Sequence, residues 1–188
     1  FMREALNNSS ALTSLYVGYG NGDFFMVRRI WDETDGKVFD APEKSAFMVQ
    51  SIDHQGEELR GRYIFLDAQL KVLRSDDRPD YATSFDPRTR GWYKAAMSAG
   101  GQVKTPPYLF FTGQKVGTTI ANRANRADAV VGADIRLETL SHTLARQKVT
   151  PGTQIVLANE RGHTIAFEDL TKAVRLVDGN PVLANVSD

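Results

Sequence analysis

The segment Phe85-Asp-Pro-Arg-Thr-Arg-Gly-Trp-Tyr-Lys-Ala-Ala96 contains two arginines, a tryptophan and a tyrosine where a turn leads into a helix. A helix beginning at Asp86-Pro87 would place Arg90 and Trp92 about 200° apart, so that they could not share a small ligand. A turn followed by a helix from Gly91 is favoured, because glycine is unfavourable inside a helix and acceptable at its start. Arg90 would then lie at the helix entrance, where exposed backbone N–H groups attract anions.

This segment has two interpretations. An arginine guanidinium suits a carboxylate, and the neighbouring rings of Trp92 and Tyr93 supply an apolar wall beside it. In the alternative, the two rings belong to the core and the arginines are solvated. The local chemistry alone leaves both interpretations open.

The residues before this segment predict short strands joined by short turns. Leu15-Tyr-Val-Gly-Tyr19 and residues 24–31 flank Asn21-Gly22-Asp23, a strong hairpin signal because Asn and Gly tolerate positive φ. Further strands are expected at residues 46–52, 62–66 and 71–74. Short connections favour antiparallel pairing. Residues 1 to about 15 have a loose helical spacing and predict the end of a helix.

The residues after this segment predict a helix over residues 92–99 that stops at Gly100-Gly101, then strands at 116–121 and 129–135. An amphipathic helix is expected from Leu137 to about residue 148, and Thr150-Pro-Gly breaks it. One more hairpin, at 154–158 and 163–167, precedes a polar tail. The fold class is α+β: an antiparallel sheet of about five to seven strands with flanking helices. The break predicts two domains, residues 1–149 and 150–188.

The composition excludes several functional classes. Lys and Arg together number 23, as do Asp and Glu, and this zero net charge argues against nucleic-acid partners. There are no cysteines, so disulfides and thiolate chemistry are excluded. The three histidines are scattered, and neither a nucleophile motif nor an acid–base pair stands out. No catalytic residue, metal site or cofactor is predicted. No apolar run reaches the ~18–20 residues that span a bilayer, so any membrane anchor is expected outside this chain.

The order of these motifs resembles that of the Cache sensor domains, in particular the double-Cache (PDC-type) extracytoplasmic domains of bacterial transmembrane receptors. The matching elements are Leu15-Tyr-Val-Gly-Tyr19, Asn21-Gly-Asp-Phe-Phe25, the segment 86–96, Pro107-Tyr108 and Val130-Val-Gly-Ala-Asp-Ile-Arg-Leu-Glu-Thr-Leu-Ser141. The resemblance covers about residues 12–170. It implies a PAS-like membrane-distal module and the start of a smaller membrane-proximal module.

The resemblance also implies a ligand site. Family pocket positions match Arg90, Trp92, Tyr93, Tyr108, Phe110 and Asp134. The amino-acid-binding branch has a tyrosine where this chain has Phe85, and an aspartate where it has Phe110. Losing that hydroxyl and carboxylate weakens the case for an α-amino acid, because a buried ammonium needs charge-assisted partners. A small carboxylate or another small organic metabolite is therefore expected. Asp134 could equally cap the helix that follows it.

The implied function is ligand sensing by a periplasmic or extracellular domain of an inner-membrane signalling receptor. The parent protein would be anchored by helices outside this chain. A homodimer through the N-terminal helix is usual for the family. The output could be a histidine kinase, a chemoreceptor, a cyclase or a phosphodiesterase, and the sequence does not choose among them. Two alternatives remain: a structural or protein-interaction module without a small ligand, and an amino-acid sensor. An enzyme is not expected.

Overall fold

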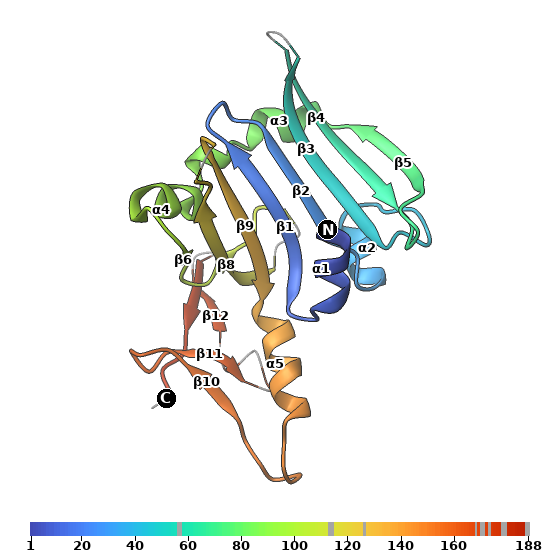
Figure 1. The fold of residues 1–188 in the computed structure, drawn as a ribbon. Helices are drawn as coiled ribbons and strands as arrows, with labels where there is room; N and C mark the ends of the chain where they lie inside the picture. Colours follow the sequence, from blue (N-terminus) through green and yellow to red (C-terminus); the bar gives the residue numbers. More distant parts are fainter. Residues whose placement is uncertain are drawn as a thin grey trace. The chain divides into compact units, whose positions relative to one another are not determined.

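The contacts of the chain divide it into two compact units, residues 1–104 with 120–134 and residues 105–119 with 135–188 (Figure 1). The computed structural model describes residues 1–55, 58–112, 115–125, 127–167, 169, 172, 174–177 and 180–186. Both units combine strands with helices, which confirms the α+β class. Within these described ranges, every helix is too short or too polar to cross a bilayer.

The first unit is built on a large sheet with the strand order β5-β4-β3-β2-β1-β9-β8-β6. The strands are β1 (Leu12–Tyr19), β2 (Phe24–Arg29), β3 (Phe47–Gln55), β4 (Glu58–Leu66), β5 (Val72–Asp77), β6 (Val103–Lys104), β8 (Val116–Arg123) and β9 (Ala129–Arg136). Strands β1 to β5 pair in sequence and are antiparallel, as the short connections predicted. The boundary between the units falls inside β8 and β9.

Helix α1 (Met2–Asn8) covers one face of this sheet (Figure 1). Its Leu6 is fully buried in a cluster with Val27 and Val49, which point from the central strands toward the helix. The helix predicted for the first residues is therefore shorter than expected, because β1 already begins at Leu12. Two further short helices, α2 (Glu33–Val38) and α3 (Pro79–Ser84), were not predicted.

The opposite face of the sheet contacts α3, the 3₁₀ turn Pro87–Thr89 and α4 (Gly91–Ala99), and is called the α4 face below. Successive strand residues point to opposite faces, so the α4 face holds alternate residues of each strand. Two glycines allow the close approach. A Cβ at Gly61 would lie 2.3 Å from the Arg78 carbonyl oxygen, and one at Gly18 would lie 2.7 Å from the Pro87 Cβ.

The start and the end of α4 confirm the preferred interpretation of the sequence. Asp86 caps the 3₁₀ turn, since its side chain accepts a hydrogen bond from the Arg88 N–H. Arg90 follows in an extended conformation and is the N-cap residue of α4, which starts at Gly91. The helix ends at Gly100, whose φ of 66° lies in the left-handed region that glycine tolerates.

The second unit contains β7 (Tyr108–Leu109), which pairs with the first half of β8, and helix α5 (Leu137–Arg146). The hairpin of β10 (Val156–Ala158) and β11 (Thr164–Phe167) confirms the predicted one. The polar tail predicted after it is wrong, because β12 (Val174–Val177) and β13 (Asn180–Leu183) form a second hairpin. The domain boundary expected between residues 149 and 150 stays a prediction.

Candidate functional site

A connected row of seven aromatic rings runs across the α4 face. The ring centroids of neighbouring members lie 4.8–5.7 Å apart, the range in which aromatic pairs attract one another. In order, the row consists of Tyr63, Tyr81, Phe85, Phe24, Tyr16, Trp92 and Tyr93. It joins β1, β2 and β4 to α3 and α4, and it includes two of the predicted ligand residues.

Asp134, on β9, accepts hydrogen bonds from two side chains of β1. The Tyr16 hydroxyl donates to Oδ1 at 2.7 Å and the Ser14 hydroxyl donates to Oδ2 at 2.8 Å. The side chain is buried, with 6% of the residue exposed. The proposed helix-cap role for Asp134 is wrong, because the N-cap of α5 is Arg136 and no side chain caps that helix. The Asp134 carboxyl group lies instead on the α4 face, held by the hydrogen bonds from Tyr16 and Ser14.

Trp92 and Asp134 are brought together by Tyr16. The Trp92 ring is buried and meets the Tyr16 ring edge-on at 4.9 Å, while the Tyr16 hydroxyl binds Asp134. Gly18 makes this approach possible, since a Cβ there would lie 3.0 Å from the Trp92 ring. Two residues that were predicted from separate parts of the sequence thus share one neighbour.

Arg90 is half-buried at the entrance of α4, with its guanidinium carbon 5.8 Å from the centre of the Phe85 ring. That distance is within the range of a cation–π interaction. Phe85 stacks on Tyr81 at 5.4 Å. Burial raises the pKa of Tyr81 well above its ordinary value, and the positive charges of Arg28 and Arg90 oppose the rise. The positive charge of Arg90 therefore acts on the phenol of Tyr81, a member of the aromatic row.

Tyr93 is buried beside Trp92, but other charges surround its phenol. Burial raises the pKa of Tyr93, the carboxylate of Asp128 adds to the rise, and Arg88 opposes it. Arg90 and Tyr93 thus interact with different groups: Arg90 with Phe85 and Tyr81, and Tyr93 with the charges around the β1–β2 turn.

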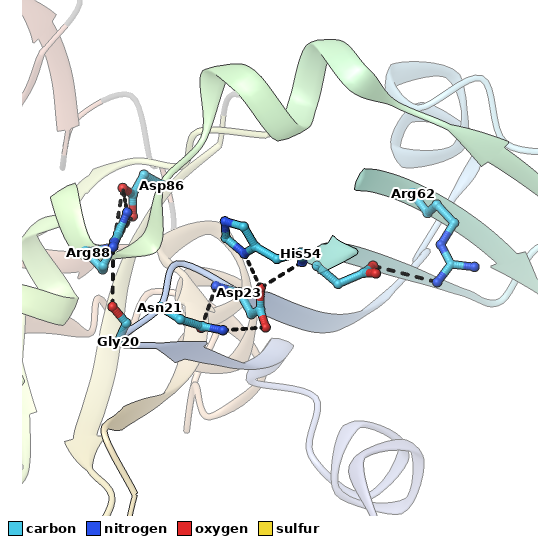
Figure 2. A network of polar contacts seen from close by, with 8 residues as sticks. Gly20, Asn21, Asp23, His54, Arg62, Asp86 and Arg88 are labelled. Carbon is cyan, nitrogen blue, oxygen red and sulfur yellow. Dashed lines mark hydrogen bonds and ion pairs between the residues drawn. The ribbon is translucent and has the colours of Figure 1, made fainter. Parts of the chain in front are cut away.

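The β1–β2 turn is the centre of a polar network (Figure 2). Asp23 accepts hydrogen bonds from the Asn21 side chain at 2.8 Å and from the His54 backbone at 3.1 Å, and its Oδ1 lies 2.7 Å from the His54 ring Nδ1. On the other side, Arg88 binds the Asp86 carboxylate and also donates to the Gly20 carbonyl oxygen at 3.3 Å. The turn is therefore connected both to β3 and to the segment that precedes α4.

Tyr108 and Phe110 belong to the second unit. The Tyr108 hydroxyl lies 2.7 Å from the Thr119 hydroxyl, and its ring meets the Phe110 ring edge-on at 5.3 Å. Phe110 is buried over Gly117, where a Cβ would lie only 2.2 Å from the ring. Within this unit, the Phe110 ring fills space that a larger residue at position 117 would occupy. Their assignment as ligand contacts stays a prediction.

Sequence reasoning missed Ser14 and Tyr16 as site residues. The signal was present, because both are on the alternate positions of a strand that point to one face. The sequence did not reveal which strand lies beside β1, because β9 is far away in the sequence. Among the residues that the structure describes, no three His, Asp or Glu side chains are grouped to hold a metal ion.

No family model matches the chain. Adenylate cyclase 1 of Rhizobium meliloti is 33% identical over 180 residues, which is 94% of this chain and 26% of that protein. The methyl-accepting chemotaxis protein PscA of Pseudomonas syringae is 35% identical over 109 residues, 55% of this chain and 16% of that protein. The chain therefore spans about a quarter or less of the length of these relatives.

Among solved structures, the ligand-binding domain of the amino-acid chemoreceptor PctB of Pseudomonas aeruginosa, in complex with L-Arg, has a similar fold. The TM-score is 0.51 at 20% identity, covering 98% of this chain and 54% of that one. The chain is thus similar in sequence to an adenylate cyclase and to a chemotaxis protein, and it has the fold of a chemoreceptor ligand-binding domain. The sequence similarity and the fold both agree with the resemblance to double-Cache sensor domains.

Proposed function

We propose that this sensor domain binds a small organic carboxylate on its α4 face and works outside the cytoplasm as part of a membrane receptor. The observation that carries the proposal is the meeting of Trp92 and Asp134 at Tyr16, in an aromatic row whose Phe85 ring contacts Arg90. Arg90 would bind the ligand carboxylate, assisted by the backbone N–H groups at the start of α4. Trp92 and Tyr93 would supply the apolar wall.

The buried polar residues of the α4 face support ligand binding over a purely structural role. Ser14, Arg28, Gln50 and Asp134 are each at most 6% exposed. Burying a polar group costs free energy unless it is hydrogen-bonded, and apolar residues would serve a plain core at least as well. Such groups are typical of a site that must recognise polar atoms.

An amino-acid ligand is the second candidate. Arg90 and Asp134 carry the two charges that a zwitterion would need, and PctB is a chemoreceptor for amino acids. Against this, Phe85 and Phe110 stand where the amino-acid-binding branch has polar groups. Tyr108 and Phe110 remain ligand contacts predicted from the resemblance alone.

The rest of the parent protein would carry the anchor and the output. We infer membrane-spanning helices outside this chain, a homodimer formed through the N-terminal helix, and an output such as a cyclase or a chemotaxis signalling domain, as in the relatives. The domain itself would do no catalysis. A ligand that binds one conformation better than another would shift the population toward that conformation and so pass on the signal.

A ligand panel tests the proposed binding. The chain is screened by thermal shift against mono- and dicarboxylates and amino acids, and the hits are measured by calorimetry. We expect stabilisation by carboxylates. Stabilisation by amino acids alone would favour the second candidate, and stabilisation by neither class would contradict binding of small acids.

The anchoring role of Arg90 has a matched control on the same helix. Arg90→Ala should weaken binding of the best acid at least about tenfold, because charge-assisted hydrogen bonds to the carboxylate are lost. Lys94→Ala removes the same charge one turn later, at an exposed position, and should leave the affinity within about twofold. Equal effects of the two variants would contradict the proposed site.

A further inference from the structure

Strand β5 forms one edge of the large sheet. Among the described strands, β5 pairs with β4 on its inner side and with no strand on its outer side, and Figure 1 shows it at the sheet edge. An edge strand presents backbone N–H and C=O groups that can pair with a further strand. Ser75 and Asp77 are exposed, and Leu73 is 37% exposed. The outer side of β5 is therefore accessible to a partner strand.

The pairing of β5 with β4 determines which backbone groups of β5 point outward. Just past the end of β5, the Arg78 N–H donates to a β4 carbonyl oxygen at 2.7 Å, so Arg78 faces β4. Positions that face the neighbouring strand alternate with positions that do not along an antiparallel pair. Asp76 and Arg74 therefore face β4 as well. Asp77 and Ser75 direct their N–H and C=O groups outward.

Two opposite charges lie side by side on β5. The Arg74 Nε donates to the Asp76 carboxylate at 2.9 Å, and the two side chains are 35% and 33% exposed. Arg74 also donates to the Asp40 carbonyl oxygen, and its guanidinium carbon lies 4.8 Å from the centre of the Phe65 ring. A guanidinium has five N–H donors and a carboxylate accepts about four hydrogen bonds, so each group can bind a further partner.

A second copy of β5 complements this charge pattern. When two identical strands pair antiparallel, a two-fold axis at Ser75 places each Arg74 opposite the partner's Asp76. An axis at Arg74, Asp76 or Asp77 places like charges opposite each other. Opposite charges directly across an antiparallel pair stabilise it, and like charges destabilise it. The charges of β5 therefore select one register, and its centre is the outward-facing Ser75.

We propose that β5 is an interaction surface for a second copy of this chain, in which the two strands pair antiparallel about Ser75 with two ion pairs between Arg74 and Asp76. This surface is separate from the interface proposed at α1, because α1 packs on a face of the sheet. The inference does not depend on the ligand site. Two short strands bury less than about 1,200 Å², so the association is weak. Receptors held in one membrane would strengthen it, because tethering raises the effective concentration.

Two charge-reversal variants test the ion pairs. Asp76→Lys places a positive charge opposite Arg74, and Arg74→Glu places a negative charge opposite Asp76. Each variant alone should have a dissociation constant at least about tenfold above that of wild type. An equal mixture restores both ion pairs between unlike copies and should associate as wild type does. Sedimentation equilibrium at up to about 1 mM chain measures this weak association, and circular dichroism reports the fold of each variant.

A disulfide tests the register and leaves both charges in place. The chain contains no cysteine, so Ser75→Cys introduces a single thiol. Opposite residues in a hydrogen-bonded antiparallel pair have Cα atoms about 5.5 Å apart, within the range of a disulfide. Asp77→Cys is the matched control, because Asp77 is exposed on the same strand and the two-fold axis separates its two copies by roughly 13 Å. Under mild oxidation, Ser75→Cys should form a dimer of about twice 20.9 kDa, and Asp77→Cys should stay monomeric.

The outcomes distinguish this surface from other modes of association. If both charge variants associate as wild type does, dimerisation uses another surface such as α1, and the pairing at β5 is wrong. A mixture that stays monomeric while wild type associates has the same meaning. Equal cross-linking of Ser75→Cys and Asp77→Cys would contradict the register. A wild-type chain that is monomeric throughout this concentration range, together with Ser75→Cys that does not cross-link, would contradict any interface at β5.

Discussion

At the scale of single residues, the polar groups of the first unit have two different roles. On the α4 face, Ser14 and Tyr16 hold a buried carboxylate in one orientation. At the β1–β2 turn, Asp23 binds His54 just beyond the end of the β2–β3 pairing, and Arg88 joins the turn to the segment that precedes α4. The first arrangement is buried and suits recognition of a ligand. The second is partly exposed and stabilises the turn locally.

The interactions of Asp23 make the stability of the folded protein depend on pH. Partial burial raises the pKa of Asp23, but hydrogen bonds from His54 and Asn21 outweigh that effect and lower it below 3.8. A carboxyl group whose pKa is lower in the folded state than in the unfolded state stabilises the fold at pH values above the unfolded-state pKa. This stabilisation is lost as the pH falls through the folded-state pKa. Asp23→Asn should therefore lower the melting temperature at pH 7 by no more than about 2–4 °C, since a partly exposed interaction contributes at most about 1 kcal/mol.

The difference between wild type and Asp23→Asn should shrink as the pH is lowered below 3.8 toward the depressed pKa at which the wild-type carboxyl takes up its proton. Melting curves from pH 7 downward measure it. Asp77→Asn removes an equal charge at an exposed position of β5 and serves as the control. A difference that stays constant with pH would contradict the role given to Asp23.

At the scale of elements, α4 shows how local sequence positions a site. Asp86-Pro87 starts a separate turn, Arg90 is extended, and the helix begins only at Gly91. This break places Arg90 at the helix entrance, whereas a continuous helix from Pro87 would have turned it away from Trp92. Gly100, the first of two glycines at the other end, stops the helix after nine residues.

Those two glycines allow a matched test. Neither Gly100 nor Gly101 has an atom within 4 Å of an added Cβ, but only Gly100 has a positive φ, at 66°. Gly100→Ala should destabilise the protein by about 1 kcal/mol, because an L-residue is strained in the left-handed region. Gly101→Ala should be close to neutral. Urea unfolding monitored by Trp fluorescence measures both, and equal effects would contradict the assigned helix end.

At the scale of the whole molecule, the chain matches about a quarter or less of the length of each relative. The relatives extend well beyond it, and they differ in kind: one is an adenylate cyclase and another a chemotaxis protein. The proposed function requires an element that passes the signal from this domain to either kind of output. The N-terminal helix is a candidate, because its inner face is packed on the sheet through Leu6 while Glu4 is exposed.

The proposed homodimer through α1 is testable because the chain contains no cysteine. Glu4→Cys should form a disulfide-linked dimer of about twice 20.9 kDa under mild oxidation, since a symmetric interface brings identical positions together. Glu43→Cys introduces a thiol at an exposed position outside the helix and should remain monomeric. Non-reducing electrophoresis separates the two, and equal cross-linking of both variants would contradict an interface at α1.

The sequence by itself determined the features that depend on neighbouring residues: the Asn21-Gly22 hairpin, the start of α4 at Gly91 and its end at Gly100. Steric limits on proline and glycine act within a few residues, so they can be read locally. Family resemblance added Trp92 and Asp134 but not the connection between them. The tertiary structure decided that connection, because the Tyr16–Asp134 hydrogen bond joins residues 118 positions apart and exists only once β1 and β9 are neighbours. It also showed that Asp134 binds two side chains of β1 and does not cap the following helix, since strand order and register determine which side chains share a face.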